Sequence, residues 1–158
     1  MTRFLKIKAL VLTLALLLGT VAVSGTERAF SSSGKGVATP IPTLPGEPPT
    51  ADVTGTGYAT HLGLFTNAGR ISFVPDANDS NLVHPIGAAT FTAANGDKLN
   101  IVVADSVMDL RTGVGTGHFS FAGGTGRFEN ASGITEFVVE QNFVSGAYEI
   151  TMVGKIDY

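Results

Sequence analysis

Three histidines are the side chains best suited to hold a metal or transfer a proton in this 158-residue chain, which contains no cysteine. They are His61, His84 and His118, so no two of them lie within 20 residues of each other. Imidazole is a common zinc ligand, but zinc sites usually include a closely spaced ligand pair, which this chain lacks. Without cysteine there is also no thiolate metal site and no cysteine nucleophile. We therefore expect no metal and no other cofactor.

The acidic residues also lack a recognisable catalytic arrangement. Glu136 and Glu140 share one face of an expected strand with Val138 between them, which is typical of a solvated outer face rather than of a glycosidase pair. The oxygen-rich loop 76–81 lacks the glycine and the distal glutamate of an EF-hand. The chain has no Gly-x-Ser-x-Gly turn, which would position a serine nucleophile. The residues therefore indicate no particular reaction.

The first 24 residues have the composition of a signal peptide. Three basic residues precede an uncharged, leucine-rich run over residues 9–23, and Ala22-Val23-Ser24 offers small side chains to a signal peptidase. At about 15 residues the apolar run is shorter than the roughly 20 that span a bilayer. We expect cleavage before Gly25, a secreted or periplasmic protein, and no stable membrane insertion after cleavage.

Removal of this leader makes the chain more acidic. The leader carries three of the ten Lys and Arg residues and none of the 13 Asp and Glu residues, so seven cations remain against 13 anions. The formal charge falls from -3 to -6. Such a surface disfavours binding to nucleic acid or to anionic membranes. We expect no nucleic-acid partner.

Residues 25–50 have the composition of a linker. A Ser-Ser-Ser-Gly-Lys-Gly stretch favours flexibility, and prolines at positions 40, 42, 45, 48 and 49 favour extended, polyproline-like backbone. The pattern predicts a flexible or disordered arm ahead of the folded domain. A polyproline ligand for a partner protein is the functional alternative.

Residues 51–158 show the period-two alternation of strands. Val, Ile, Thr, Phe and Tyr dominate short runs that turn residues separate. Asn95-Gly96 is the strongest hairpin signal, because a type I′ turn needs positive φ at both central positions, and Asn67–Gly69 is interpreted as another separating turn. Glycines inside the runs indicate strong bending or close backbone approach. The pattern predicts an all-β domain, a single antiparallel β-barrel of seven to eight strands, with strands at 53–60, 70–74, 86–93, 98–104, 114–122, 134–140 and 148–156.

The most distinctive segment is Phe-Ala-Gly-Gly-Thr-Gly-Arg-Phe-Glu-Asn-Ala-Ser-Gly at 121–133. It resembles the characteristic turn of the allene oxide cyclase and dirigent barrel superfamily. Residues 148–156 are similar to the last strand of that superfamily, and residues 60–66 to an early motif of an uncharacterised, exported bacterial branch. The resemblance implies an allene oxide cyclase-like (calycin-like) barrel of eight strands with an apolar cavity open at one end. Plant members cyclise an epoxide or steer a radical coupling, but their polar catalytic residues find no match in this chain.

Five residues of this segment are expected to form a structural turn. Gly123, Gly124 and Gly126 supply φ values that residues with a Cβ avoid. Phe128 then plugs one end of the barrel, and Gly133 begins the next strand. A phosphate-binding loop is excluded, because the Gly-Lys-Ser/Thr ending and a following helix are both missing.

Alternation along the strands also predicts a ligand wall. An eight-stranded barrel is just wide enough to be filled by side chains or to hold one small ligand, and both alternatives remain open. A shift of one residue in register would send every one of these side chains outside. Asn100 or His118 is the expected polar contact. The expected apolar wall consists of Tyr58, Phe119, Phe137, Tyr148 and Met152.

Three functions follow as alternatives. The first is an exported barrel that binds a small apolar ligand or serves as a structural module, without an assigned reaction. The second is a cyclase or isomerase that acts by pocket shape, which the resemblance implies. The third is an extracellular partner-binding domain displayed on the proline-rich arm. A homo-oligomer is compatible with all three.

Overall fold

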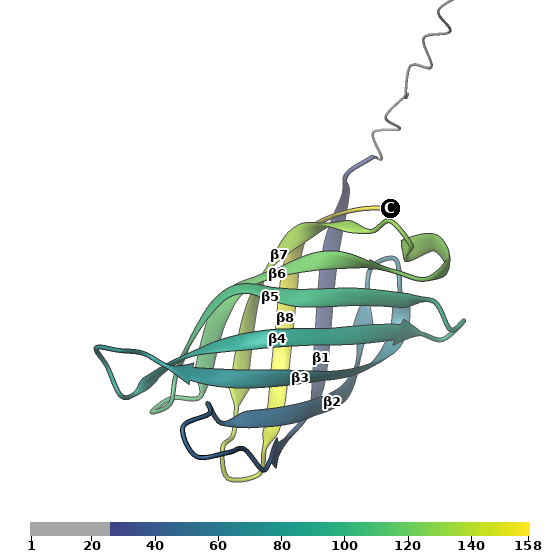
Figure 1. The fold of residues 1–158 in the computed structure, drawn as a ribbon. Coiled ribbons are helices and arrows are strands. Elements are labelled where there is room, and N and C mark those ends of the chain that lie inside the picture. The colour runs from purple at the N-terminus through teal and green to yellow at the C-terminus, as the bar shows by residue number, and fades with distance from the viewer. Residues whose placement is uncertain (1–25) are drawn as a thin grey trace, which may run out of the picture.

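The computed structural model describes residues 26–158, and the leader expected at 1–24 lies outside them. Eight antiparallel strands pair in sequence order, and β8 pairs back with β1, so the sheet closes into a barrel (Figure 1). One short 3₁₀ helix, η1, precedes β7. The predicted fold class is confirmed. The elements are β1 (Arg28–Ile41), β2 (Thr50–Ala59), β3 (Gly63–Pro75), β4 (Leu82–Ala93), β5 (Lys98–Asp109), β6 (Val114–Gly124), η1 (Gly126–Phe128), β7 (Ser132–Gln141) and β8 (Ala147–Asp157).

The barrel begins within the segment predicted to be a linker. The prediction of a flexible arm over 25–50 is wrong for Arg28–Ile41, because these residues form β1. β1 pairs with β2 on one side and with β8 on the other, and it closes the sheet. Serine and glycine have a weak strand preference, but hydrogen-bonded neighbours on both sides override it. Of the proline-rich part, only residues 42–49 form a loop.

Two turn predictions also need correction. Asn95-Gly96 does join β4 to β5, but only Gly96 has a positive φ, of 90°. The Ala93 N–H bonds to Asp97 O at 2.9 Å and the Gly96 N–H to Ala93 O at 2.9 Å. These bonds describe a three-residue loop with glycine in the left-handed region, rather than a type I′ turn. The turn predicted at Asn67–Gly69 lies inside β3.

One end of the barrel is closed by the distinctive glycine-rich segment. Phe128 of η1 is fully buried, as predicted, and packs against the Tyr158 ring with centroids 5.0 Å apart. Gly123 and Gly126 have φ values of 70° and 59°, also as predicted. Gly124 differs, because its φ is not positive; a Cβ there would instead collide with the Lys98 carbonyl.

The half of the barrel next to this plug is filled by side chains. Two stacked aromatic pairs cross it, Phe65 with Phe91 at 4.5 Å and Phe119 with Phe137 at 4.3 Å between centroids. Both pairs belong to one continuous apolar core that also contains Phe128. The filled half therefore fixes the positions of the strands around the other half.

His84 of β4 forms an ion pair with the β3–β4 loop and a hydrogen bond with β5 on the outer wall. The His84 ring lies between two acceptors, with Nε2 2.9 Å from Asp76 Oδ2 and Nδ1 2.8 Å from Ser106 O. Both ring nitrogens can donate only in the imidazolium form. Accordingly, the Asp76 carboxylate, followed by the Ser106 carbonyl, raises the pKa of His84. The hydrogen bond from His84 is the main cause that lowers the pKa of Asp76 to about 2.

This pair makes stability depend on pH. Because the pKa of His84 is raised on folding, its contribution is complete below about pH 6.5 and is lost as the pH rises through the folded-state value. Asp76 contributes above about pH 3.8 and loses its contribution as the pH falls toward about 2. We expect His84→Gln to lower the melting midpoint more at about pH 5.5 than at about pH 8.5. Melting curves of the parent and the variant check this; a difference that grows toward alkaline pH would contradict it.

Candidate functional site

The half of the barrel away from the plug contains a cavity of about 110 Å³. Its wall comes from inward-facing positions of all eight strands, and these side chains are mostly apolar. The interior is therefore filled in one half and hollow in the other. The apolar part of the lining includes Val53, Ile71, Phe73, Ala89, Val103, Val139 and Ile150.

Tyr148 and Asn67 form a polar pair on this wall. The Asn67 Nδ2 donates to Tyr148 Oη at 3.0 Å, and the Tyr148 hydroxyl makes only a long contact, 3.4 Å, with Thr54 O. Burial is the main cause that raises the pKa of Tyr148 above 10, so the phenol stays protonated at neutral pH. A protonated hydroxyl held at one position can donate a hydrogen bond to a bound molecule.

A glycine of β1 makes room for this pair. A Cβ on Gly36 would lie 2.6 Å from Tyr148 Oη and would overlap the Thr54 carbonyl. The tyrosine ring therefore lies across the strand where no side chain is present. The expectation that glycines inside the predicted strands mark a close approach is confirmed at Gly55 and Gly57 of β2, where a Cβ would collide with a carbonyl oxygen of β1.

Four of the seven predicted ligand residues face the interior. Phe119, Phe137 and Tyr148 line the cavity. Met152 also points inward and is buried, but it belongs to the packed core and not to the cavity lining. For these four positions the predicted register is correct.

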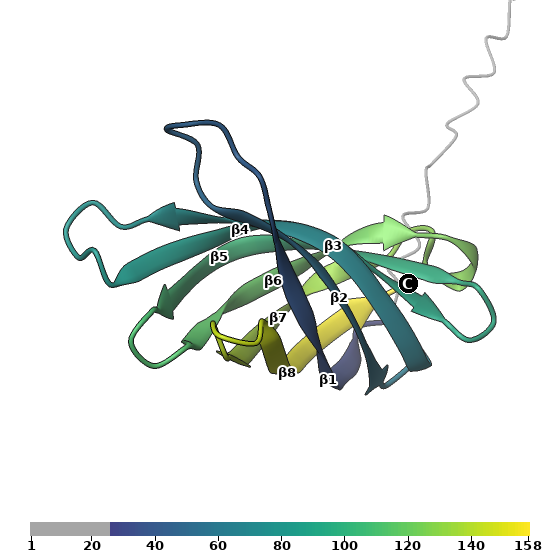
Figure 2. The ribbon, with the colours of Figure 1, turned by 90° about the horizontal axis from the view of Figure 1, so that it is seen from below.

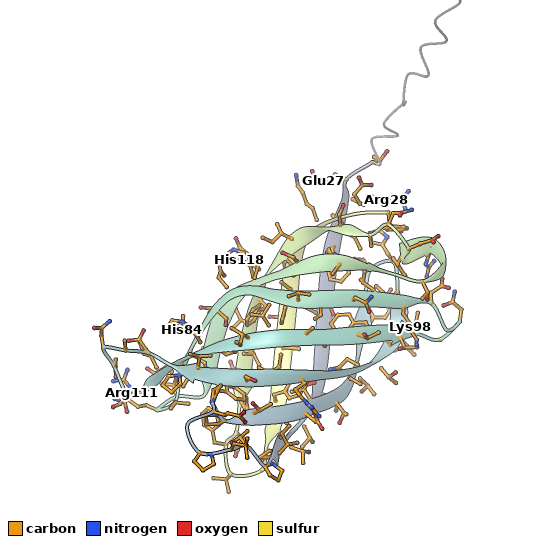
Figure 3. All side chains as sticks on the ribbon, in the orientation of Figure 1. Glu27, Arg28, His84, Lys98, Arg111 and His118 are labelled. Carbon is orange, nitrogen blue, oxygen red and sulfur yellow. The ribbon has the colours of Figure 1, made fainter. Side chains whose placement is uncertain are left out.

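The other three lie on the outer wall, so their predicted place in the interior is wrong. The Tyr58 side chain is exposed, since the inward positions of β2 are its neighbours Gly57 and Ala59. Asn100 Oδ1 accepts from Thr90 Oγ1 at 2.9 Å across β4 and β5. His118 projects outward between Gly117 and Phe119, with Nδ1 2.7 Å from Asp105 Oδ1 (Figure 3). Strict alternation within each strand puts them on the face opposite their buried neighbours.

Sequence reasoning missed two polar residues of the wall, Asn67 and Gln141. Asn67 was hidden by the mistaken turn, although it stands in period two with Phe65, Ile71 and Phe73. Gln141 follows the inward positions Phe137 and Val139 at the end of β7. In both cases the inward–outward alternation of the strand predicts an inward side chain at a position that a polar residue occupies.

The cavity adjoins a second hollow at the mouth of the barrel. This hollow, of about 360 Å³, shares Ala38, Phe73 and Gln141 with the cavity. Its rim includes Leu110, Phe143 and other residues of the loops that join the strands at this end. This part of the mouth is therefore mainly apolar and lies directly outside the cavity.

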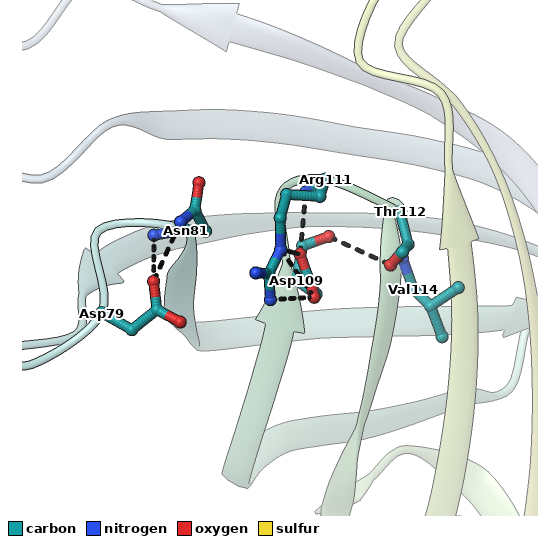
Figure 4. A network of polar contacts seen from close by, with 6 residues as sticks. All are labelled: Asp79, Asn81, Asp109, Arg111, Thr112 and Val114. Carbon is teal, nitrogen blue, oxygen red and sulfur yellow. Dashed lines mark hydrogen bonds and ion pairs between the residues drawn. The ribbon is translucent and has the colours of Figure 1, made fainter.

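Hydrogen bonds shape two of the mouth loops. In the β5–β6 loop, Arg111 Nη2 donates to Asp109 Oδ2 at 2.7 Å, and Thr112 Oγ1 contacts Asp109 O (Figure 4). In the β3–β4 loop, Asp79 Oδ1 accepts from the Asn81 amide and backbone. The Leu110 N–H donates to Asn81 O at 2.8 Å and joins the two loops. This side of the mouth is thereby held in one arrangement.

The lining limits what the site can do chemically. No carboxylate is among the residues that line the cavity, and its one charged residue, Lys35, occupies an exposed position of β1. Within residues 26–158, no cluster of three metal-ligating side chains occurs. The described part of the chain also holds no helix long and apolar enough to cross a membrane. What the site offers is an apolar surface with one oriented hydroxyl and two amides.

Comparison with known proteins gives a likeness of fold. No family model matches the chain, and no curated protein matches it. Among solved structures, it is similar to the pterocarpan synthase dirigent protein GePTS1, with a TM-score of 0.57 and 13% identity over 84% of this chain and 86% of the other. The pterocarpan synthase dirigent protein PsPTS1 gives a TM-score of 0.53 and 13% identity over 84% of this chain and 94% of the other. At this identity the likeness shows the fold alone: the chain has a dirigent-like, eight-stranded barrel fold.

Proposed function

We propose that this protein binds one small, uncharged, largely apolar molecule inside the open half of the barrel, without an assigned reaction. The observation that carries the proposal is an apolar cavity in which a single oriented hydroxyl, that of Tyr148, is backed by the Asn67 amide. A pocket with mostly apolar walls and few convergent polar groups is the usual form of a small-molecule site. The similar structures are pterocarpan synthase dirigent proteins, and a likeness at 13% identity supports the barrel fold but not their reaction.

The size of the cavity sets the size of the ligand. Pockets for drug-sized molecules usually measure about 300–1,000 Å³, whereas this cavity measures about 110 Å³. An engineered apolar cavity of about 150 Å³ is known to bind benzene. The ligand class is therefore a single ring or a molecule of similar volume. A hydroxyl or carbonyl on that ring would meet the Tyr148–Asn67 pair.

A cyclase or isomerase that acts by pocket shape is the weaker alternative. Proton transfer in such a reaction is usually carried by a side chain within hydrogen-bond reach of the substrate. Apart from Lys35, which occupies an exposed position of β1, the titratable residue of the lining is Tyr148, and its pKa is raised. The geometry therefore supports orientation of a ligand better than acid–base chemistry.

Removal of one hydroxyl tests the proposed site. We expect Tyr148→Phe to weaken binding of phenol about tenfold, because one hydrogen bond between buried groups is lost. Benzene binding should change by less than about twofold, since the aromatic ring remains. Calorimetric titration of the parent and the variant with both ligands gives the comparison. Equal weakening for phenol and benzene would show that the hydroxyl plays no part.

We also propose that the chain is exported, with cleavage before Gly25 and release into the periplasm or the medium. Cleavage there would leave every strand of the barrel intact, because β1 begins at Arg28. N-terminal sequencing of protein recovered outside the cytoplasm should give a start near Gly25. A protein that keeps residues 1–23 in that fraction would contradict cleavage.

A further inference from the structure

The mouth of the barrel carries apolar side chains that point into solvent. Val144 is 99% exposed and Phe143 is 46% exposed on the β7–β8 loop, and Leu44 is 69% exposed on the β1–β2 loop. Both loops lie at the end of the barrel opposite the plug (Figures 1 and 2). We call these three side chains the apolar rim.

Four of the five N–H groups of the β7–β8 loop, residues 142–146, are hydrogen-bonded within the hairpin. Asn142 Oδ1 accepts from the Val144 N–H at 2.9 Å and from the Ser145 N–H at 3.0 Å. The Gly146 N–H donates to Asn142 O, and the Asn142 N–H donates to Ala147 O, both at 2.8 Å. The tip of this loop therefore presents Val144 and Phe143 on a backbone with few free donors, whose carbonyls at residues 143–145 stay open to water or headgroups.

The β1–β2 loop also has few unpaired backbone N–H groups, but for a different reason. Four of its eight residues, at positions 42, 45, 48 and 49, are prolines, which have no N–H to satisfy. The Leu44 N–H donates to Glu47 Oε2 at 3.0 Å, and the Glu47 N–H donates to Leu44 O at 3.0 Å. Leu44 is thus also carried by a segment with few unpaired donors.

These features together match one kind of surface. Hydrocarbon offers no hydrogen bonds, so the loop backbones, which keep open carbonyls, would stay among the hydrated headgroups while only the apolar side chains reach the acyl chains. A few apolar side chains on such a segment can anchor a protein at the boundary between headgroups and acyl chains. We propose that the apolar rim docks the barrel mouth on an uncharged lipid bilayer surface.

Charge favours a neutral lipid over an anionic one. The β7–β8 loop, Asn-Phe-Val-Ser-Gly, carries no charge, and the charged residue of the β1–β2 loop is Glu47. Arg111 of the neighbouring β5–β6 loop is paired with Asp109 at 2.7 Å, so it offers no excess positive charge. Docked in this way, the mouth hollow would face the lipid, and an apolar ligand could pass from the bilayer to the cavity without crossing water.

Flotation with phosphatidylcholine vesicles tests the docking. Residues 25–158 contain the whole closed barrel and lack the apolar leader, so they are the chain to use. We expect this chain to float with the vesicles, and Val144→Asp to reduce the bound fraction at least tenfold, since a buried valine contributes more than a factor of ten in partition. Val153→Asp is the matched control, because Val153 is 66% exposed on the outer wall away from the rim. It should leave binding unchanged.

Two further flotation measurements distinguish docking by the apolar rim from nonspecific adsorption to the vesicles. Asn142→Ala keeps every apolar side chain of the rim but removes the acceptor for two backbone donors, and it should also weaken flotation. Addition of phosphatidylglycerol should not strengthen binding. Failure of the parent chain to float, equal losses for Val144→Asp and Val153→Asp, or a rim-dependent dimer in place of vesicle binding would each overturn the proposal. None of these outcomes bears on phenol binding in the cavity.

Discussion

Phe128→Ala should lower the free energy of unfolding by about 3–5 kcal/mol, which is the usual cost of deleting a buried aromatic ring. Phe128 is fully buried at the closed end, where the whole barrel is sealed by one short segment. The η1 turn is held by the Phe128 N–H to Thr125 O at 3.1 Å and by the Ala131 N–H to Phe128 O at 3.0 Å. The variant would therefore leave a cavity that this tightly bonded turn cannot collapse to fill.

Urea unfolding of the parent and the variant measures this cost. A domain of this kind has about 5–15 kcal/mol of stability in total, so the expected loss is a large part of it. Phe143→Ala is the matched control, since Phe143 is half exposed on the β7–β8 loop, and it should cost less than about 1 kcal/mol. Similar losses for the two variants would mean that η1 does not act as a plug.

Much of the barrel could be predicted from the sequence, because alternation is a direct consequence of closing a sheet around one core. The runs that became β4, β6, β7 and β8 place apolar residues or glycine at most inward positions, although the outer face also carries exposed apolar residues such as Ile134 and Val153. β1 was not predicted as a strand, because it lacks this alternation of large apolar residues. Its inward positions include Ser32, Gly34 and Gly36, small residues whose role is to leave space for larger side chains such as Tyr148.

The candidate site was predicted only in part, and the errors have a common cause. Phe119, Phe137 and Tyr148 are large apolar residues whose burial follows from their type. Tyr58, Asn100 and His118 were chosen because their functional groups suit a ligand site, but each alternates with buried neighbours and lies outside. Asn67 was missed because a local turn signal, Asn-Ala-Gly, conflicts with the long strand in which it stands. Pairing with β2 and β4 decides that conflict in favour of the strand.

Filling the cavity should abolish ligand binding while the barrel stays folded. Val53 lines the cavity on β2, and its cross-strand neighbours are Ala38 on β1 and Gly69 on β3. With such small neighbours, the larger ring of Val53→Phe has room mainly in the cavity itself. Filling a cavity often stabilises a protein by about 0.5–2 kcal/mol, and any overpacking would offset that gain by about 1–3 kcal/mol. The variant should therefore fold, with a melting midpoint close to that of the parent.

The direct measurement is a calorimetric titration of Val53→Phe with phenol, beside the parent and Val37→Phe. Val37 is 45% exposed on the outer face of β1, so the same substitution there adds a ring without touching the cavity. We expect binding for the parent and for Val37→Phe, and a loss of at least about tenfold for Val53→Phe, because the ring occupies the space of the ligand. Undiminished phenol binding by a folded Val53→Phe protein would contradict a ligand site inside the barrel.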